Sequence, residues 1–243
     1  MLPVGDEGTP PSPSFPFVNI GIIVLCILVF LVQLMFGADQ SVLAYGTVPY
    51  EIIHGVDLGP TSCTPAICQG IPLQSIHFPV YLTLLTSIFM HASWVHIGGN
   101  MLFLFIFGDN VEDSMGHLGY LIFYLVCGLI ANFAQILVDP SSPIPGIGAS
   151  GAIAGVMAAY LVLFPQARVR VLVGYLGIWR VPAIFMIGLW AVTQLVSGVG
   201  SIVTVPSTGG GGGVAYFAHI GGFIAGLVLV WVFRRGTLRP AYR

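Results

Sequence analysis

The sequence predicts an all-α membrane protein, a six-transmembrane-helix bundle with a short, recessed fourth helix and a long outer first loop. Of its 243 residues, 56% are hydrophobic and 7% are charged, whereas a soluble domain of this size carries about 25% charged residues. Most of the surface is therefore expected to face lipid. A net charge of −2 provides no basic stripe to neutralise phosphates, which argues against nucleic acid as a partner.

Six apolar segments approach the length of about 20 residues that a helix needs to cross a bilayer. They cover residues 17–36, 96–111, 118–137, 150–164, 181–204 and 215–233. We expect one domain over residues 17–233, between a flexible cytoplasmic tail of residues 1–16 and a basic cytoplasmic tail of residues 234–243. The first tail lacks the basic start of a cleavable signal peptide, so we expect the first span to be retained.

The basic residues predict which way the bundle faces. All seven are arginines, three around the connection between the fourth and fifth segments and four after the sixth. The positive-inside rule places both groups in the cytoplasm, and six spans put both termini on that side. The loop of residues 37–79, the proline-rich turn of residues 139–145 and the Gly209–Gly213 run, predicted to be a flexible loop, then lie outside. We expect a multi-pass protein of the cell (plasma or inner) membrane.

The fourth segment is too short to cross the bilayer fully. Residues 150–164 extend about 22 Å as a helix, against about 30 Å of hydrocarbon. If this helix ends at the cytoplasmic surface, it begins below the outer surface. Irregular backbone at that depth is tolerated only inside protein or beside a water-filled cavity. The sequence therefore predicts a recessed, wet cavity that opens outward at Ser150.

Four polar residues are predicted to lie at similar depth near that cavity. His96 and Asn100 share one face of the second span, Ser150 begins the fourth, and His219 lies about one turn into the sixth. Polar side chains within a membrane are functional candidates, because hydrocarbon penalises them. A serine with a histidine base can perform nucleophilic acyl transfer, in which an amide, a second histidine and the Ser150 N–H can stabilise the oxyanion. No Asp or Glu lies at this depth on the other spans, so we expect a dyad.

These residues resemble the signature of the rhomboid family of intramembrane serine proteases. The similarity runs from His91 to Gly226 and includes HASWVHIGGNMLF, FGDNVEDSMG, GASG and AHIGGFIAG. The resemblance implies that Ser150 and His219 form the catalytic dyad. It also implies that His96 and Asn100 bind the oxyanion.

The resemblance carries further expectations. Gly222 and Gly226 match small residues that let the sixth helix pack closely on the fourth, and Glu112 matches a structural residue at the cytoplasmic end of the second span. The implied substrate is a transmembrane protein in the lipid bilayer, cut near the outer end of its helix after local unwinding. No metal or cofactor is implied.

Two departures leave questions open. Many relatives carry an aromatic ring four residues after the serine, packed against the histidine, but that residue here is Ala154. The sequence does not say what holds His219. The first loop also lacks the Trp-Arg pair of some relatives and contains Cys63 and Cys68 instead, which leaves a disulfide or a metal site with further ligands as alternatives.

Each signal taken alone has a structural alternative. The GASG motif could be a helix contact, and His219 or the His96/Asn100 pair could be interhelical hydrogen-bonding groups. A metalloprotease is excluded because no histidine is followed by glutamate, and an aspartyl protease because every Asp is in a tail or near a loop. The remaining alternatives are a catalytically silent relative that binds membrane helices and a small transporter, although no internal repeat is visible.

Overall fold

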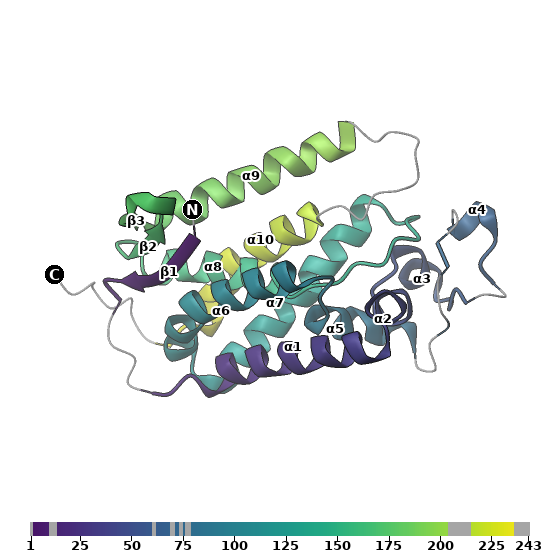
Figure 1. Ribbon diagram of the computed structural model, residues 1–243, viewed down its shortest axis with the longest axis horizontal. Coiled ribbons are helices and arrows are strands. Elements are labelled where there is room, and N and C mark those ends of the chain that lie inside the picture. Colours follow the sequence, from purple (N-terminus) through teal and green to yellow (C-terminus); the bar gives the residue numbers. More distant parts are fainter. Residues whose placement is uncertain are drawn as a thin grey trace.

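The computed structural model describes residues 2–9, 14–59, 62–68, 71–72, 75, 79–203 and 215–235. The Gly209–Gly213 run and residues 236–243 of the basic tail lie outside the described residues. The elements in chain order are β1 (Leu2–Glu7), α1 (Phe17–Phe36), α2 (Ala38–Tyr45), α3 (Pro49–His54), α4 (Pro65–Cys68), η1 (Val80–Leu82), α5 (Thr83–Thr86), η2 (Ser87–Phe89), α6 (Trp94–Met115), α7 (His117–Val138), α8 (Ser150–Leu163), β2 (Arg168–Leu172), η3 (Gly174–Leu176), β3 (Ile178–Pro182), α9 (Ala183–Val203) and α10 (Tyr216–Phe233) (Figure 1).

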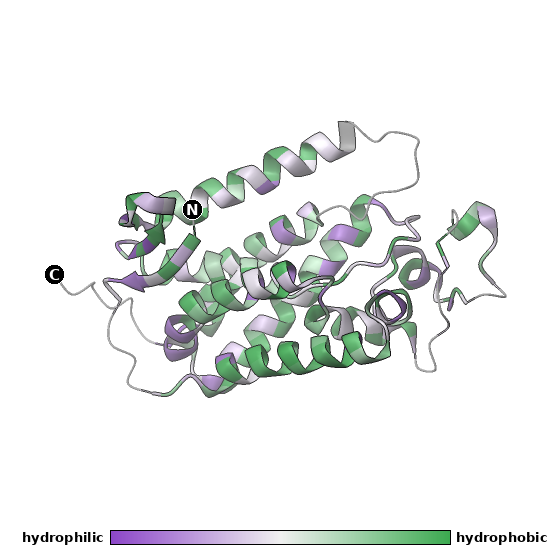
Figure 2. Ribbon diagram, in the orientation of Figure 1, coloured by the Kyte–Doolittle hydropathy of each residue, from purple (hydrophilic) through white to green (hydrophobic). Residues whose placement is uncertain are grey.

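Apolar helices of membrane-spanning length make up most of the bundle. Among the described residues, α1, α7, α9 and α10 are long and apolar enough to cross a bilayer. Helix α6 and the short helices of Val80–Phe89 form a further candidate span with a 76° bend, while α8 has only 14 residues. Hydrophobic residues predominate along α1, and they alternate with less hydrophobic ones along α9 (Figure 2). The predicted all-α membrane fold is confirmed, and these helices are consistent with six spans.

Helix α8 lies at the centre of the bundle. All its residues from Gly151 to Tyr160 are buried, and it packs against α6, α7 and α10. A helix enclosed on every side needs apolar residues all round, which explains why this segment has no polar face. Its first residue, Ser150, is the exception and lies where the helix meets the preceding loop.

Four glycines let α8 and α10 approach until their backbones touch. A Cβ on Gly222 would overlap the carbonyl group of Gly151, and a Cβ on Gly226 would overlap that of Gly155. On each helix the two glycines are four residues apart, an arrangement that favours close helix association in lipid. The close packing expected from Gly222 and Gly226 is therefore confirmed.

Buried hydrogen bonds join the start of α1 to α6 and the end of α1 to the turn that precedes α6. Where α1 begins, the Glu112 carboxylate accepts the N–H groups of Val18 and Asn19 at 3.0 and 2.7 Å, which satisfies donors that have no partner within the helix. Where α1 ends, the Gln33 amide exchanges hydrogen bonds of 3.0 and 3.2 Å with the backbone of His91. These bonds fix the turn from which α6 starts.

The N-terminal segment differs from its predicted structure. Residues 1–16 were expected to be a flexible tail, but Leu2–Glu7 forms β1, antiparallel to β2, which pairs in turn with β3. Glu7 contacts the guanidinium groups of Arg170 and Arg180 at 3.8 and 3.1 Å. The prediction was wrong because the local composition does not reveal a partner strand far along the chain.

Asp6 attaches this three-stranded sheet to the helices. Its carboxylate accepts hydrogen bonds from the Tyr160 hydroxyl of α8 at 2.6 Å and from the Asn110 amide of α6 at 3.1 Å. Burial raises the pKa of Asp6, although the bond from Tyr160 opposes that effect. The sheet therefore covers the ends of α6 and α8, at the opposite end of the molecule from α4 (Figure 1).

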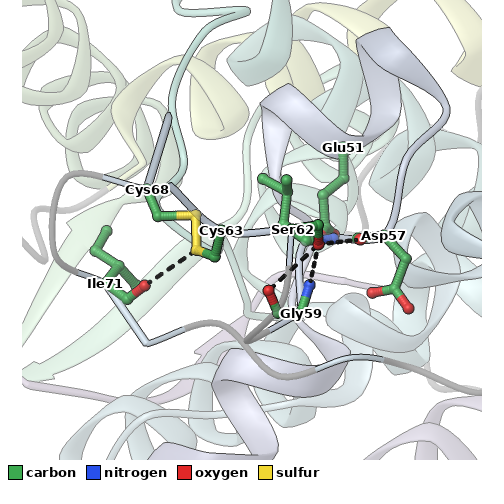
Figure 3. Close-up of a disulfide and its surroundings, with 8 residues drawn as sticks. Glu51, Asp57, Gly59, Ser62, Cys63, Cys68 and Ile71 are labelled. Atoms are coloured by element: carbon green, nitrogen blue, oxygen red, sulfur yellow. Dashed lines mark hydrogen bonds between the residues drawn. A yellow bond between two sulfur atoms is a disulfide. The ribbon is translucent and has the colours of Figure 1, made fainter. Parts of the chain in front are cut away.

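The loop between α1 and α6 is folded around a disulfide. Cys63 and Cys68 are joined within the segment that contains α4 (Figure 3). This cross-link decides between the alternatives that the sequence left open. Cys68 packs with Val48 and Leu58 in a small separate core, so the disulfide lies beside the residues that hold this loop together.

Glu51, on α3 of the same loop, is buried. The residue is 5% exposed, and its carboxylate accepts the Leu58 N–H at 2.8 Å. Burial, supported by the charge of nearby Asp57, raises the pKa of Glu51 to about 7. The carboxyl group is therefore expected to change its protonation state near neutral pH.

Replacing Gly222 by alanine is expected to push α8 and α10 apart, because the added Cβ would overlap the Gly151 backbone. Overpacking of this kind costs about 1–3 kcal/mol, so the midpoint of thermal unfolding in detergent should fall. Gly188→Ala on α9 is the matched control, since no atom lies within 4 Å of its added Cβ. Equal midpoints for the two variants would contradict the close contact.

Stability is expected to depend on pH through Glu51. The pKa of Glu51 in the folded protein, about 7, lies above the value of about 4.3 for an unfolded chain, so the folded state binds the proton more tightly. The contribution of Glu51 to the free energy of unfolding should therefore decrease as pH rises from about 4.3 to 7 and then level off. Glu51→Gln should remove this contribution, so that thermal stability falls less with rising pH than in the wild type, whereas Asp39→Asn, at an exposed carboxylate, should leave the dependence unchanged. The same dependence on pH in Glu51→Gln and in the wild type would refute the assignment.

Candidate active site

Ser150 is presented by a loop that hydrogen bonds to distant backbone. Gly146 exchanges N–H···O bonds of 2.8 and 2.9 Å with Thr47, and the Gly148 N–H donates to the carbonyl of Ser87 at 2.8 Å. Gly148 has a φ of +132°, which residues with a side chain rarely adopt. The loop therefore enters α8 in one conformation, and the Ser150 N–H at the helix start has no acceptor within the helix.

His219, in the first turn of α10, contacts this serine. Its Nε2 lies 2.7 Å from the Ser150 Oγ, the distance of a hydrogen bond in which a hydroxyl donates to an unprotonated ring nitrogen. The His219 residue is 8% exposed. Because Ser150 is on α8 and His219 on α10, this contact requires the close approach of the two helices described above.

His96 and Asn100 line a cavity of about 660 Å³ together with Ser150 and His219. The cavity is bounded by α6, α8, α9, α10 and the loop before α8. The missing side chain of Gly148 makes room for the His96 ring, since a Cβ there would lie 3.0 Å from His96 Nε2. The structure thus brings together all four polar residues that were predicted to form the site.

Two N–H donors belong to this cavity. The Ala92 N–H donates to His96 Nδ1 at 3.3 Å, so Nδ1 is the unprotonated nitrogen and Nε2 carries the hydrogen. Asn100 Nδ2 is buried without a hydrogen-bond partner among the described residues. Such buried donors are rare in folded proteins. Both groups are available to donate to an oxygen atom bound near Ser150.

A second cavity, of about 220 Å³, reaches Ser150 from the side of α7. Its lining includes the polar side chains of Asn132, Gln135 and Asp139. Gln135 also accepts the Ala218 N–H at 3.3 Å, which holds the residue before His219. A polar cavity of this size has room and partners for water, so Ser150 lies between the larger cavity and a polar one.

Two residues that contact His219 were not identified from the sequence, and both are on α9. Gln194 Oε1 lies 2.7 Å from His219 Nδ1, and the Trp190 ring centroid lies 5.6 Å from that of the imidazole. Ala154 is fully buried and supplies no ring. The signal that could have revealed the pair is an amide one helical turn after a tryptophan, within an apolar span.

Comparison with known proteins places these residues in a family. The Rhomboid domain matches residues 79–236. Rhomboid-like protein 11, chloroplastic, of Arabidopsis thaliana is 31% identical over 164 residues, which are 65% of this chain and 55% of that protein. Rhomboid protein 1, mitochondrial, of Saccharomyces cerevisiae is 24% identical over 180 residues, which are 70% of this chain and 47% of the yeast protein. Against these two relatives, the chain spans about half of their length.

Inactive rhomboid protein 1 of Drosophila melanogaster is also similar, at 30% identity over 103 residues, which are 42% of this chain and 7% of that protein. The similar proteins therefore include one whose name marks it as inactive. The Rhomboid domain match extends over more than half of the chain and contains all four polar residues that line the larger cavity. This membrane protein belongs to the rhomboid family.

Proposed function

We propose that the protein is an intramembrane serine endopeptidase that hydrolyses peptide bonds in or near transmembrane segments of membrane-protein substrates. The observation that carries the proposal is the 2.7 Å contact between Ser150 Oγ and His219 Nε2, inside a cavity that His96 and Asn100 also line. A hydroxyl, an imidazole base and further donors are the groups that acyl transfer requires.

In the proposed reaction, His219 Nε2 accepts the Ser150 proton while Oγ attacks the carbonyl carbon of the substrate peptide. The carbonyl π electrons move onto oxygen and form an oxyanion. His96 Nε2–H, Asn100 Nδ2–H and the Ser150 backbone N–H are the donors assigned to it. The Asn100 amide nitrogen supports this role, because an oxyanion would supply the partner that it lacks among the described residues.

Collapse of the tetrahedral intermediate breaks the C–N bond, and His219 transfers its proton to the leaving amine. The acyl group remains as an ester on Ser150. Water then attacks the ester with His219 again acting as base, which releases the carboxylic acid product and restores the serine hydroxyl. The polar cavity beside α7 is the proposed source of this water.

Substrate choice is proposed to depend on how readily a helix unwinds. Helical hydrogen bonds hide peptide bonds, so a substrate segment must open before its carbonyl can reach Ser150. Glycine and proline lower that cost, and segments that contain them should be cut preferentially. The distribution of arginines supports a site that opens on the extracytoplasmic side of the cell membrane, with both tails of the 17–233 domain in the cytoplasm.

A catalytically silent protein that only binds membrane helices is the alternative, favoured by the similarity to the inactive Drosophila protein. Binding alone does not need a serine hydroxyl directed at a histidine nitrogen, and the Ser150–His219 contact therefore favours the protease. A small transporter is the third possibility, and the same experiment separates all three.

Purified protein in liposomes is expected to cut a single-span model substrate, and both Ser150→Ala and His219→Ala should lower the rate at least about 10³-fold. Ser41→Ala on α2 is the matched control and should leave the rate unchanged. Products are measured by gel electrophoresis. Cleavage that survives in Ser150→Ala would eliminate the serine mechanism. Binding without cleavage by the wild type would identify a silent relative, and substrate transport without cleavage would identify a transporter.

Asn100→Ala is expected to lower kcat by about 10- to 10³-fold with little change in KM, because the amide is proposed to bind the oxyanion and not the ground state. The midpoint of thermal unfolding should stay close to that of the wild type, since the Asn100 amide nitrogen has no partner among the described residues to lose. A raised KM with an unchanged kcat would assign Asn100 to substrate binding instead.

A further inference from the structure

We propose that Gln194 is a positioning residue that fixes the tautomer of His219 and completes a chain of hydrogen bonds from Ser150 through His219 to α9. The inference rests on the serine protease function proposed above. It adds a third residue to what the sequence predicted as a dyad, and it assigns that residue to a helix on which no site residue was expected.

The two nitrogens of His219 have different partners. Nε2 lies 2.7 Å from Ser150 Oγ, and Nδ1 lies 2.7 Å from Gln194 Oε1. An amide oxygen can only accept a hydrogen bond, so Nδ1 must carry the hydrogen. In a neutral imidazole the lone pair then resides on Nε2, where the serine proton has to be received. Gln194 thus selects the tautomer in which His219 can act as a base.

The neighbouring hydroxyl orients the Gln194 amide. Thr193 Oγ1 donates its hydrogen to the Trp190 carbonyl at 2.6 Å, so its lone pairs remain to accept from Gln194 Nε2 at 3.4 Å. With the amide NH2 group engaged there, the amide oxygen is the end that faces His219. The Trp190 ring packs against the His219 imidazole at an interplanar angle of 37°, with 5.6 Å between the centroids, and it restricts the rotation of the imidazole.

Gln194 belongs to the face of α9 that packs against the bundle. Ile187, Trp190, Gln194 and Gly198 follow helical spacing, and Ile187 is fully buried. Helices α9 and α10 approach closely at Gly198, since a Cβ on this glycine would lie 3.2 Å from the Tyr216 Cβ of α10. Gln194 is the polar member of this stripe. The groove of about 270 Å³ around it is otherwise lined by apolar side chains and His219, where an unmade hydrogen bond is costly.

A neutral amide suits this position better than a carboxylate. An aspartate or glutamate would hold the same tautomer, but its charge at this depth of the membrane would be costly when the histidine is neutral. The amide orients the ring without a buried charge. One consequence is testable: a carboxylate placed at residue 194 should favour the protonated imidazole, which the amide does not.

The test measures cleavage of a single-span substrate over a range of pH for the wild type, Q194L and Q194E, together with labelling of Ser150 by a fluorophosphonate. Q194L should lower kcat and the labelling rate about 10- to 100-fold with little change in KM, because the base is no longer held in one tautomer. Q194E should retain a larger share of the rate, and the acid limb of its pH profile should move to higher pH.

Ser201→Ala, at another polar residue of α9 whose hydroxyl bonds to the Gly198 carbonyl, is the control and should keep the wild-type profile. A purely structural Gln194 would change the thermal midpoint but not the pH profile, and that result would overturn the inference. If Q194L does not fold, the Q194E profile decides: an unmoved acid limb overturns the proposal. A wild type that neither cleaves nor becomes labelled at Ser150 overturns the protease function itself, whereas active wild type with unchanged variants removes only the role of Gln194.

Discussion

Backbone contact between α8 and α10, where Gly151 and Gly155 face Gly222 and Gly226, is the constraint on which the site depends. Hydrocarbon does not drive apolar helices together as water does, so helices in a membrane associate through close packing and polar contacts. A side chain at these positions would separate the helices. The serine and the histidine come from different helices, and a hydrogen bond of 2.7 Å tolerates little separation.

Buried polar groups inside the bundle hydrogen bond to neighbouring helices and loops, because the surroundings have a low dielectric constant. Glu112 satisfies the start of α1, and Gln33 satisfies the backbone at His91 before α6 begins. An unmade hydrogen bond costs more here than in water, so most buried polar groups have a partner. Among the described residues, the Asn100 amide nitrogen departs from this pattern, as do the ring nitrogens of His91 and the Tyr124 hydroxyl. Of these groups, Asn100 is the one that lines the cavity beside Ser150, which is why it is assigned to the proposed oxyanion site.

Some features were predictable because they depend on local composition or on spacing along one helix. The predicted segments coincide with the apolar helices, and Ser150, His96, Asn100 and His219 do line one cavity. The sheet was not predicted, because β1 pairs with a strand more than half the chain away. The disulfide between Cys63 and Cys68 was one of two alternatives, since spacing alone does not distinguish a cross-link from metal ligands.

The sequence by itself determined that this is a membrane-embedded helical protein, and it identified the residues that can perform acyl transfer. Both conclusions follow from local properties, namely the length of each apolar segment and the polar residues inside it. Only the tertiary structure decided what holds His219. Ala154 supplies no aromatic ring, and the sequence does not reveal that Gln194 and Trp190 on α9 contact the imidazole instead. The spacing of residues along the chain does not show which face of α9 contacts α10. That contact depends on how the two helices are rotated and packed against each other, and Gly198 is where they approach closely.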